Sequence, residues 1–241
     1  MPEDYFGEDV AAWYDDDLGS YGDPAVIAQT VDVLAELAGG GAALELAIGT
    51  GRIALPLVER GVPVHGIDLS EAMVARLRAK PGGDAIPVTI GDFATTRVPG
   101  EFALAYLVFN TISNLTTQDA QVACFANAAS HLAPGGCFVI EVGVPELRRL
   151  APGETMVVFD ASEDHWGIDE YDVVAQGLVS HHFSAVDGAV HKSSIPFRYA
   201  WPAELDLMAR LAGMRLRERW ADWDRSPFTA DSGKHVSVWE K

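Results

Sequence analysis

The first 140 residues alternate short apolar runs with segments of helical periodicity, and this alternation limits the fold more than any other feature of the chain. Apolar runs at residues 43–48, 62–69, 86–90, 102–109 and 138–142 are typical of strands. Helical patterns at 24–38, at 51–60, after residue 70 and at 116–132 separate these runs. Strands that alternate with single helices imply right-handed βαβ units and a parallel sheet buried on both faces. We therefore predict a doubly wound, Rossmann-like α/β sheet.

Local signals mark the ends of several predicted helices. Asp23 and Pro24 suit the N-cap and the first helical position, and the glycines at 39–41 suit the end of that helix. Ser70 is the expected cap of a later helix. Thr116 with Asp119 resembles a capping box for the helix that ends near residue 132.

The pattern changes after residue 145. Segments 156–159, 173–183 and 189–199 have β character without helices between them, and Asp187-Gly188 is a hairpin turn signal. A helix at 202–214 and strands at 215–223 and 235–239 follow. We therefore divide the chain into a core at 1–144 with an N-terminal lid, an antiparallel insertion at 145–200, and a segment at 201–241 that completes the core.

The charge balance restricts the partners of the protein. Thirty-five Asp and Glu face 17 Lys and Arg, which gives a formal net charge of −18. Such a surface repels phosphate backbones and anionic lipids, so nucleic acid and membrane surfaces are not expected partners. The acidic N-terminus has no apolar signal region, and no run approaches the ~20 apolar residues of a membrane helix. Cys124 and Cys137 lack metal-ligand spacing, so we expect no metal site. We expect both to be buried thiols of a protein in the reducing cytoplasm.

Three candidate ligand-binding segments follow successive predicted strands. Residues 45–52, with glycines at 49 and 51, join the first strand to a helix, where backbone N–H groups can meet a ligand. Asp68 ends the second strand, and a carboxylate there can accept both ribose hydroxyls of an adenosine without needing a buried partner of its own. Asp92 and Phe93 close the third strand and can hold an adenine ring. All three segments fall at the sheet edge where open parallel sheets bind ligands.

The spacing of the glycines separates two classes of cofactor. A dinucleotide fingerprint needs G-x-G-x-x-G, whereas Gly49-Thr50-Gly51 is followed by Arg52, Ile53 and Ala54. An acid before the glycines, Glu45, is also atypical of NAD binding.

The same residues resemble the E/D-x-G-x-G-x-G motif of class I S-adenosylmethionine-dependent methyltransferases. Glu45, Gly49 and Gly51 match that motif, and Ala47 replaces its first glycine. The segment from Asp68 to Met73 is similar to the family's second motif. The resemblance implies a seven-stranded sheet with its last strand antiparallel and S-adenosylmethionine as cofactor. It also implies a set of cofactor-binding residues: Tyr14, Glu45, Ala47, Gly49, Gly51, Arg52, Asp68, Leu69, Met73, Asp92, Phe93 and Phe109.

The acceptor side is less defined. Residues 12–15 resemble the segment that folds over the cofactor in small-molecule members of the family, which makes Tyr5 and Tyr14 lid candidates. Asn114 stands where related sugar N-methyltransferases often carry a His, and an amide can orient an acceptor but cannot take its proton. His181 and His182 are the candidate bases for a hydroxyl acceptor, and adjacent residues of a strand point to opposite faces.

Three functions fit these observations. The first is methyl transfer from S-adenosylmethionine to N or O of a small molecule, with Asn114, Tyr5, His181 and His182 as candidate catalytic residues. The second is an NAD(P)-dependent oxidoreductase on a similar sheet. The third is a non-catalytic protein that binds an adenosyl ligand.

Overall fold

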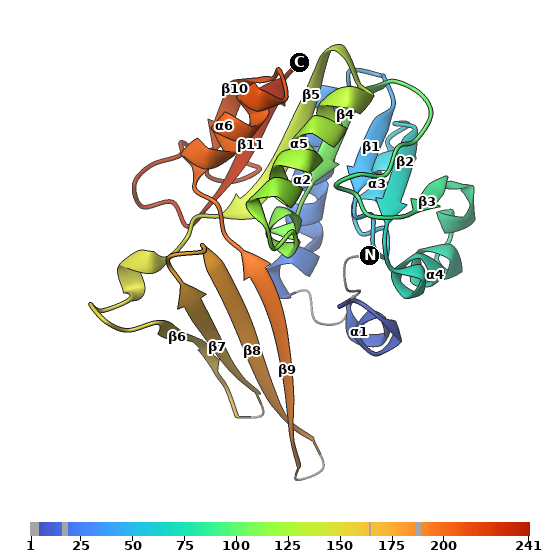
Figure 1. Ribbon diagram of the computed structural model, residues 1–241. Coiled ribbons are helices and arrows are strands. Elements are labelled where there is room, and N and C mark those ends of the chain that lie inside the picture. Colours follow the sequence, from blue (N-terminus) through green and yellow to red (C-terminus); the bar gives the residue numbers. More distant parts are fainter. Residues whose placement is uncertain (1–4, 16–18, 164, 187–188) are drawn as a thin grey trace.

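A computed structural model describes residues 5–15, 19–163, 165–186 and 189–241, which form two β-sheets with helices around the larger one (Figure 1). The α-helices are α1 (Glu8–Trp13), α2 (Pro24–Ala38), α3 (Ala54–Glu59), α4 (Glu71–Ala79), α5 (Gln118–His131) and α6 (Pro202–Leu211). The 3-10 helices are η1 (Gly19–Gly22), η2 (Gly83–Ala85), η3 (Thr111–Asn114) and η4 (Leu147–Arg149).

The larger sheet has seven strands in the order β10-β11-β5-β4-β1-β2-β3. Its strands are β1 (Ala43–Leu46), β2 (Val64–Asp68), β3 (Val88–Ile90), β4 (Phe102–Leu107), β5 (Leu132–Gly143), β10 (Arg215–Trp220) and β11 (Lys234–Glu240). β1 to β5 pair in parallel, and β11 is antiparallel to both β5 and β10. The predicted seven-stranded sheet with an antiparallel last strand is therefore confirmed.

Helices bury both faces of this sheet. Side chains of α5 and α6 pack into one apolar cluster, and those of α2 and α3 pack into the cluster on the other face. All four residues of β1 are buried, as expected for a central strand of a doubly wound fold. Asp23 caps α2 and Pro24 is its first residue, as predicted, and Gly39 ends the helix with φ of +56°.

Backbone geometry explains where the boundaries differ from prediction. β1 ends at Leu46, because Ala47 takes φ of +60° and leaves the extended conformation. α3 starts at Ala54, since positive φ values at Gly49 and Gly51 form a turn first. The cap of α5 is Thr117, whose Oγ1 accepts the N–H of Ala120 at 3.2 Å; the predicted cap at Thr116 was wrong by one residue.

The smaller sheet is antiparallel and has the order β6-β7-β8-β9. Its strands are β6 (Met156–Ala161), β7 (His165–Asp172), β8 (Gly177–Val186) and β9 (Ala189–Arg198). The sequence did not indicate β7, because both of its faces mix apolar and charged residues; pairing with β6 and β8 on its two sides holds it extended. The turn signal Asp187-Gly188 lies outside the described residues.

A buried polar contact joins the smaller sheet to the core. Arg198, at the end of β9, donates to Gln121 of α5 at 2.5 Å and to Glu204 of α6 at 2.7 Å. Arg198 is only 5% exposed, so this charge is held by its partners inside the molecule. Among the described residues, none of the helices has the length and apolar character to cross a membrane.

Candidate active site

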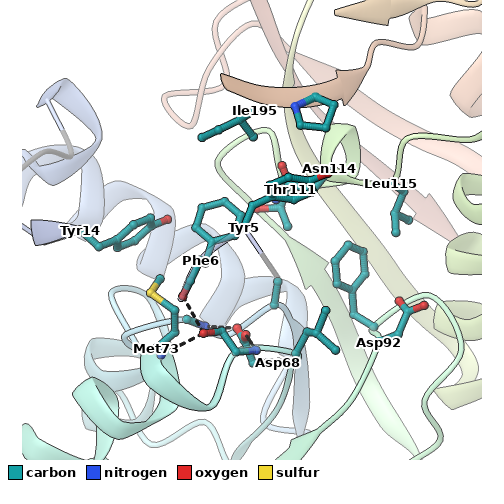
Figure 2. Close-up of a pocket in the computed structure, with 16 residues that line it drawn as sticks. Tyr5, Phe6, Tyr14, Asp68, Met73, Asp92, Thr111, Asn114, Leu115 and Ile195 are labelled. Carbon is teal, nitrogen blue, oxygen red and sulfur yellow. Dashed lines mark hydrogen bonds between the residues drawn. The ribbon is translucent and has the colours of Figure 1, made fainter. Parts of the chain in front are cut away.

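The carboxyl ends of the parallel strands open into a main cavity of about 120 Å³ (Figure 2). Loops after β1, β2, β3 and β4 supply most of its walls, and the N-terminal segment and β9 close it from above. Its lining residues are Tyr5, Phe6, Tyr14, Ala47, Gly49, Asp68, Leu69, Ser70, Met73, Asp92, Phe93, Thr111, Asn114, Leu115, Ile195 and Pro196.

A smaller cavity of about 30 Å³ adjoins it and shares Tyr14, Ala47, Gly49 and Thr111. The other residues that line it are Glu45, Ile48, Thr50, Arg52, Ile53, Val108 and Phe109. Together the two cavities bring together every predicted cofactor residue except Gly51. We treat them as one site with a main and an inner part.

Gly51 lies beside the site and shapes it. Its φ is +79°, and a Cβ there would come within 2.4 Å of the Leu77 side chain of α4. Only glycine fits this turn, because both the backbone conformation and the packing exclude a side chain. Ala47, at the first glycine position of the motif, takes φ of +60° and lines both parts of the site.

Asp68 ties the two loops of the main cavity together. Its Oδ2 accepts the N–H of Gly49 at 2.6 Å, and its Oδ1 accepts the N–H of Ser70 at 2.8 Å. Asp68 is 7% exposed, so the expectation that it needs no buried partner was wrong. An ionised carboxylate accepts several hydrogen bonds, so Asp68 suits a ligand that donates hydroxyl groups in the cavity.

Glu45 is a buried acid in the inner part of the site. Tyr106 donates its hydroxyl to Glu45 Oε2 at 2.8 Å, and Glu45 is 3% exposed. Burial raises the pKa of Glu45 to about 8, although the hydrogen bond from Tyr106 and the charge of Arg52 oppose the shift. A carboxyl in this state gains from any cation that enters beside it.

Arg52 and two aromatic rings also line the inner part. The Arg52 guanidinium donates to the carbonyl of Tyr21 at 3.0 Å and lies 5.4 Å from the centroid of the Phe109 ring. Tyr14 meets Phe109 edge-on at 6.4 Å. Burial, ahead of nearby charges, raises the pKa of Tyr14 to about 12, so its hydroxyl stays protonated at neutral pH.

The far end of the main cavity is framed by the loop after β3. Asp92 Oδ1 accepts the N–H of Ala94 at 2.8 Å, which fixes the carboxylate at the mouth of that loop. Phe93 is 8% exposed, packs into the core and also lines the cavity. Leu115 continues this apolar wall (Figure 2).

Two predicted catalytic residues reach the main cavity and two do not. Tyr5 and Asn114 line it, with Thr111 and Ile195 nearby (Figure 2). His181 and His182 lie on β8, and β9 stands between that strand and the cavity. His181 contacts Ser194 and Glu170 on one face, whereas His182 contacts His165 and Phe159 on the other. The structure therefore does not bring either histidine to the site.

Sequence reasoning missed several lining residues. Ser70 and Thr111 lie within segments that the sequence already indicated as part of the site, next to predicted site residues. Phe6, Ile195 and Pro196 come from distant parts of the chain, and only the folded structure places them at the cavity. Within the part of the chain that is described, no group of three or more His, Cys, Asp or Glu side chains could hold a metal ion.

Comparison with known proteins identifies the family. A model of the methyltransferase domain matches residues 43–136. The CcbJ methyltransferase from Streptomyces caelestis is 36% identical over 97% of this chain and 96% of that chain, with a TM-score of 0.86. The chain belongs to the S-adenosylmethionine-dependent methyltransferases. S-adenosylmethionine is accordingly its methyl donor, and the match favours methyl transfer over the oxidoreductase and non-catalytic alternatives.

Two further proteins are similar to this chain, one in sequence and one in fold. The cypemycin N-terminal methyltransferase of a Streptomyces species is 25% identical over 205 residues, which cover 84% of each protein. CalS10 from Micromonospora echinaspora, described as an amino pentose methyltransferase, shares the fold with a TM-score of 0.68 at 21% identity, over 95% of this chain and 94% of that chain.

Proposed function

We propose that the enzyme methylates an amine of a small molecule, and that the two-part cavity holds the methyl donor. The observation that carries the choice of an amine is the lining of the main cavity. Among the described residues, its ionisable lining side chains are Tyr5, Tyr14, Asp68 and Asp92, without a His or Lys. A hydroxyl acceptor gains from a base, whereas a neutral amine already carries the lone pair it needs.

The residues of the inner part fit the amino-acid end of S-adenosylmethionine. Glu45 is a buried carboxyl with a raised pKa, so it gains a counter-ion when an ammonium group enters. Arg52 lines the same space and suits a carboxylate. In the main cavity, the Asp68 carboxylate suits ribose hydroxyls, and Asp92 with Phe93 suits adenine. When bound, S-adenosylmethionine supplies a methyl group on a positively charged sulfonium.

The protein's own part in the reaction is alignment. Asn114 and Thr111 of η3 and Tyr5 of the lid point polar groups into the same space, where they can orient an amine in line with the methyl group (Figure 2). The amine lone pair forms the new C–N bond as the C–S bond breaks onto sulfur. The proton of the resulting ammonium then passes to water. We also propose that residues 145–200 cover the acceptor side, because Ile195 and Pro196 line the cavity, and that the net charge of −18 keeps nucleic acids away.

The pH dependence of turnover tests this mechanism. With a series of amines of different pKa, we expect the apparent pKa in kcat/KM to follow the pKa of the amine, since only the neutral form reacts. Methyl-labelled S-adenosylmethionine and matched amine and alcohol acceptors provide the assay. A fixed apparent pKa throughout the series, or preferred methylation of the alcohols, would contradict an unassisted amine.

Replacing Asn114 with alanine should lower kcat by about tenfold or more, because a loss of orientation acts on the transfer step. The dissociation constant of S-adenosylhomocysteine should change less than about twofold (~0.4 kcal/mol). Thr116→Ala, an exposed substitution two residues further along, is the matched control. Single-turnover rates with the best amine of the series measure the effect; an unchanged rate would remove Asn114 from the reaction.

Polar contacts of Asp15 with Thr50 and Lys80, which we call the latch, hold the N-terminal lid segment against the site. Asp15 accepts a hydrogen bond from Thr50 Oγ1 at 2.6 Å and pairs with Lys80 Nζ at 2.6 Å, while Lys80 Nζ also donates to the Thr50 carbonyl at 2.9 Å. On the other side of the lid, Ser70 Oγ donates to the Phe6 carbonyl at 2.7 Å. Thr50 belongs to the loop after β1, so the latch joins the lid to the wall of the site.

Breaking this latch should speed exchange of the cofactor. Asp15→Ala removes the hydrogen bond to Thr50 and the ion pair with Lys80. Because these groups are partly exposed, their contribution to the free energy is small, and we expect dissociation of S-adenosylhomocysteine to become about three- to tenfold faster. Asp84→Ala removes an equal charge at an exposed site and is the control. Stopped-flow displacement measures both rates. Equal rates in Asp15→Ala and wild type would show that the latch does not limit exchange.

A further inference from the structure

A second cleft, larger than the cofactor site, lies on the other side of η3. Thr111 and Asn114 of this short helix face the cofactor site, whereas Asn110 and Ser113 line the cleft. Its volume is about 450 Å³, which is in the range of small-molecule sites. The segment after β5 forms one wall and the smaller sheet forms the other.

The wall that the smaller sheet supplies consists mainly of apolar and aromatic side chains, with Asp169 as its one acidic residue among those that the structure describes. Strand register places Val157, Asp169 and Ser180 side by side on β6, β7 and β8, so these three side chains share the face toward the cleft. Four aromatic rings also line the cleft: Phe159, Tyr171, Phe197 and Tyr199. A carboxylate among aromatic rings is the chemistry that binds alkylammonium groups.

The charges around Asp169 leave the cleft negative. Burial raises the pKa of Asp169, although Ser180, His182 and Arg149 favour its ionised form. Arg149 pairs with Glu146 at 2.8 Å, so the charges of these two lining residues offset each other and the charge of Asp169 remains. The negative charges of Asp169 and Glu146 add to burial in raising the pKa of Tyr171 to about 12.

The buried hydroxyl of Tyr199 is a second, independent observation that indicates a ligand in the cleft. Tyr199 is 7% exposed, lines the cleft and packs against the Tyr171 ring, with centroids 5.9 Å apart. Its hydroxyl is buried and has no hydrogen-bond partner among the described residues. A buried hydroxyl without a partner costs free energy, which a ligand with a polar group would recover.

We propose that this cleft binds a small molecule with a cationic amine on an apolar body, with Asp169 as the counter-ion. Binding there does not require the proposed amine methylation, because η3 separates the cleft from the cofactor site. The same chemistry is found in a distal amino group of a long acceptor and in a separate small amine.

Titration with a matched pair of probes tests the proposal. The probes are 2-phenylethylammonium and 2-phenylethanol, which share the apolar body and differ in charge. Wild type should bind the ammonium at least tenfold more tightly than the alcohol, and Asp169→Asn should remove that preference while changing alcohol affinity less than about twofold (~0.4 kcal/mol). Glu154→Gln, an equal charge change at an exposed position before β6, should keep the preference. Saturation-transfer NMR or calorimetry measures each affinity.

Additional measurements separate the possible results. Unchanged binding of S-adenosylhomocysteine by Asp169→Asn shows that the variant is folded. It also shows that a loss of ammonium binding in the cleft is independent of the proposed cofactor site. Labelled S-adenosylmethionine and long α,ω-diamines tell the two sources apart: methylation of one amine that weakens in Asp169→Asn supports a distal acceptor group, and binding of the ammonium without any methylation of the diamines supports a separate ligand. Equal ammonium affinity in Asp169→Asn and wild type, or no preference for the ammonium in wild type, would overturn the proposal.

Discussion

Asp68→Ala is expected to weaken binding of S-adenosylhomocysteine by about a hundredfold or more. We propose that the carboxylate accepts hydrogen bonds from two ribose hydroxyls, and charge-assisted hydrogen bonds contribute roughly 1.5–3 kcal/mol each. The same change leaves the N–H groups of Gly49 and Ser70 without their acceptor. We therefore also expect the free energy of unfolding to fall by about 1–3 kcal/mol.

Asp68→Asn separates these two effects. Asparagine keeps one acceptor oxygen for the loops but loses the charge and one acceptor, so its melting temperature should lie between those of wild type and Asp68→Ala. Its affinity for S-adenosylhomocysteine should still fall by at least about tenfold (~1.4 kcal/mol). Calorimetric titration and thermal unfolding measure the two quantities. Wild-type affinity in Asp68→Asn would mean that Asp68 only supports the loops.

Glu45→Gln should weaken cofactor binding and stabilise the free protein at the same time. At pH 8 the folded wild type must hold Glu45 as a partly ionised, buried carboxyl, whereas glutamine fills the same space without a charge and still accepts the Tyr106 hydrogen bond. We expect about a hundredfold loss of affinity for S-adenosylhomocysteine, because the ammonium group loses its counter-ion. The variant should be more stable than wild type at pH 8 by about 4 kcal/mol, since each unit by which the pKa of Glu45 is raised contributes ~1.4 kcal/mol.

The direction of the pH effect follows from the raised pKa. Between the ordinary value of 4.5 and about 8, the unfolded chain releases the Glu45 proton while the folded protein keeps it. This group therefore makes the free wild-type protein less stable as pH rises through that range, and the loss levels off above pH 8. Glu45→Gln should lack this component, and its stability advantage should vanish near pH 4.5. Denaturant unfolding at several pH values measures it; a pH-independent difference would contradict the assignment.

Cofactor affinity should depend on the same proton. An ammonium group pairs with ionised Glu45, so binding releases a proton below pH 8, and affinity should fall by about tenfold between pH 7 and pH 6. Titrations in buffers of different ionisation enthalpy count the released proton. Glu45→Gln should release none.

The core of the fold could be predicted because its signals are local. Apolar runs separated by capped helices indicated β1 to β5, and the acids and glycines at their ends stand next to each other because parallel strands end at one edge. This reasoning predicted that Glu45, Asp68 and Asp92 lie at one edge of the sheet, and all three line the two-part cavity. It could not show that Asp68 is bonded to Gly49, since that contact joins two loops whose approach depends on strand pairing.

The acceptor side could not be predicted from local pattern. β7 has no clean alternation, and its place between β6 and β8 depends on long-range pairing. For this reason His181 and His182 were reasonable candidates from the sequence, although β9 separates them from the cavity. The lid contact between Asp15 and Lys80 and the cleft around Asp169 likewise join segments far apart in the chain.

The most direct test of the account is calorimetric titration of the wild-type protein with S-adenosylhomocysteine and, separately, with NAD⁺. The structure predicts that S-adenosylhomocysteine binds at one site per chain with a pH-dependent affinity, and that NAD⁺ does not bind. Binding of NAD⁺ without binding of S-adenosylhomocysteine would contradict the assignment of the two-part cavity.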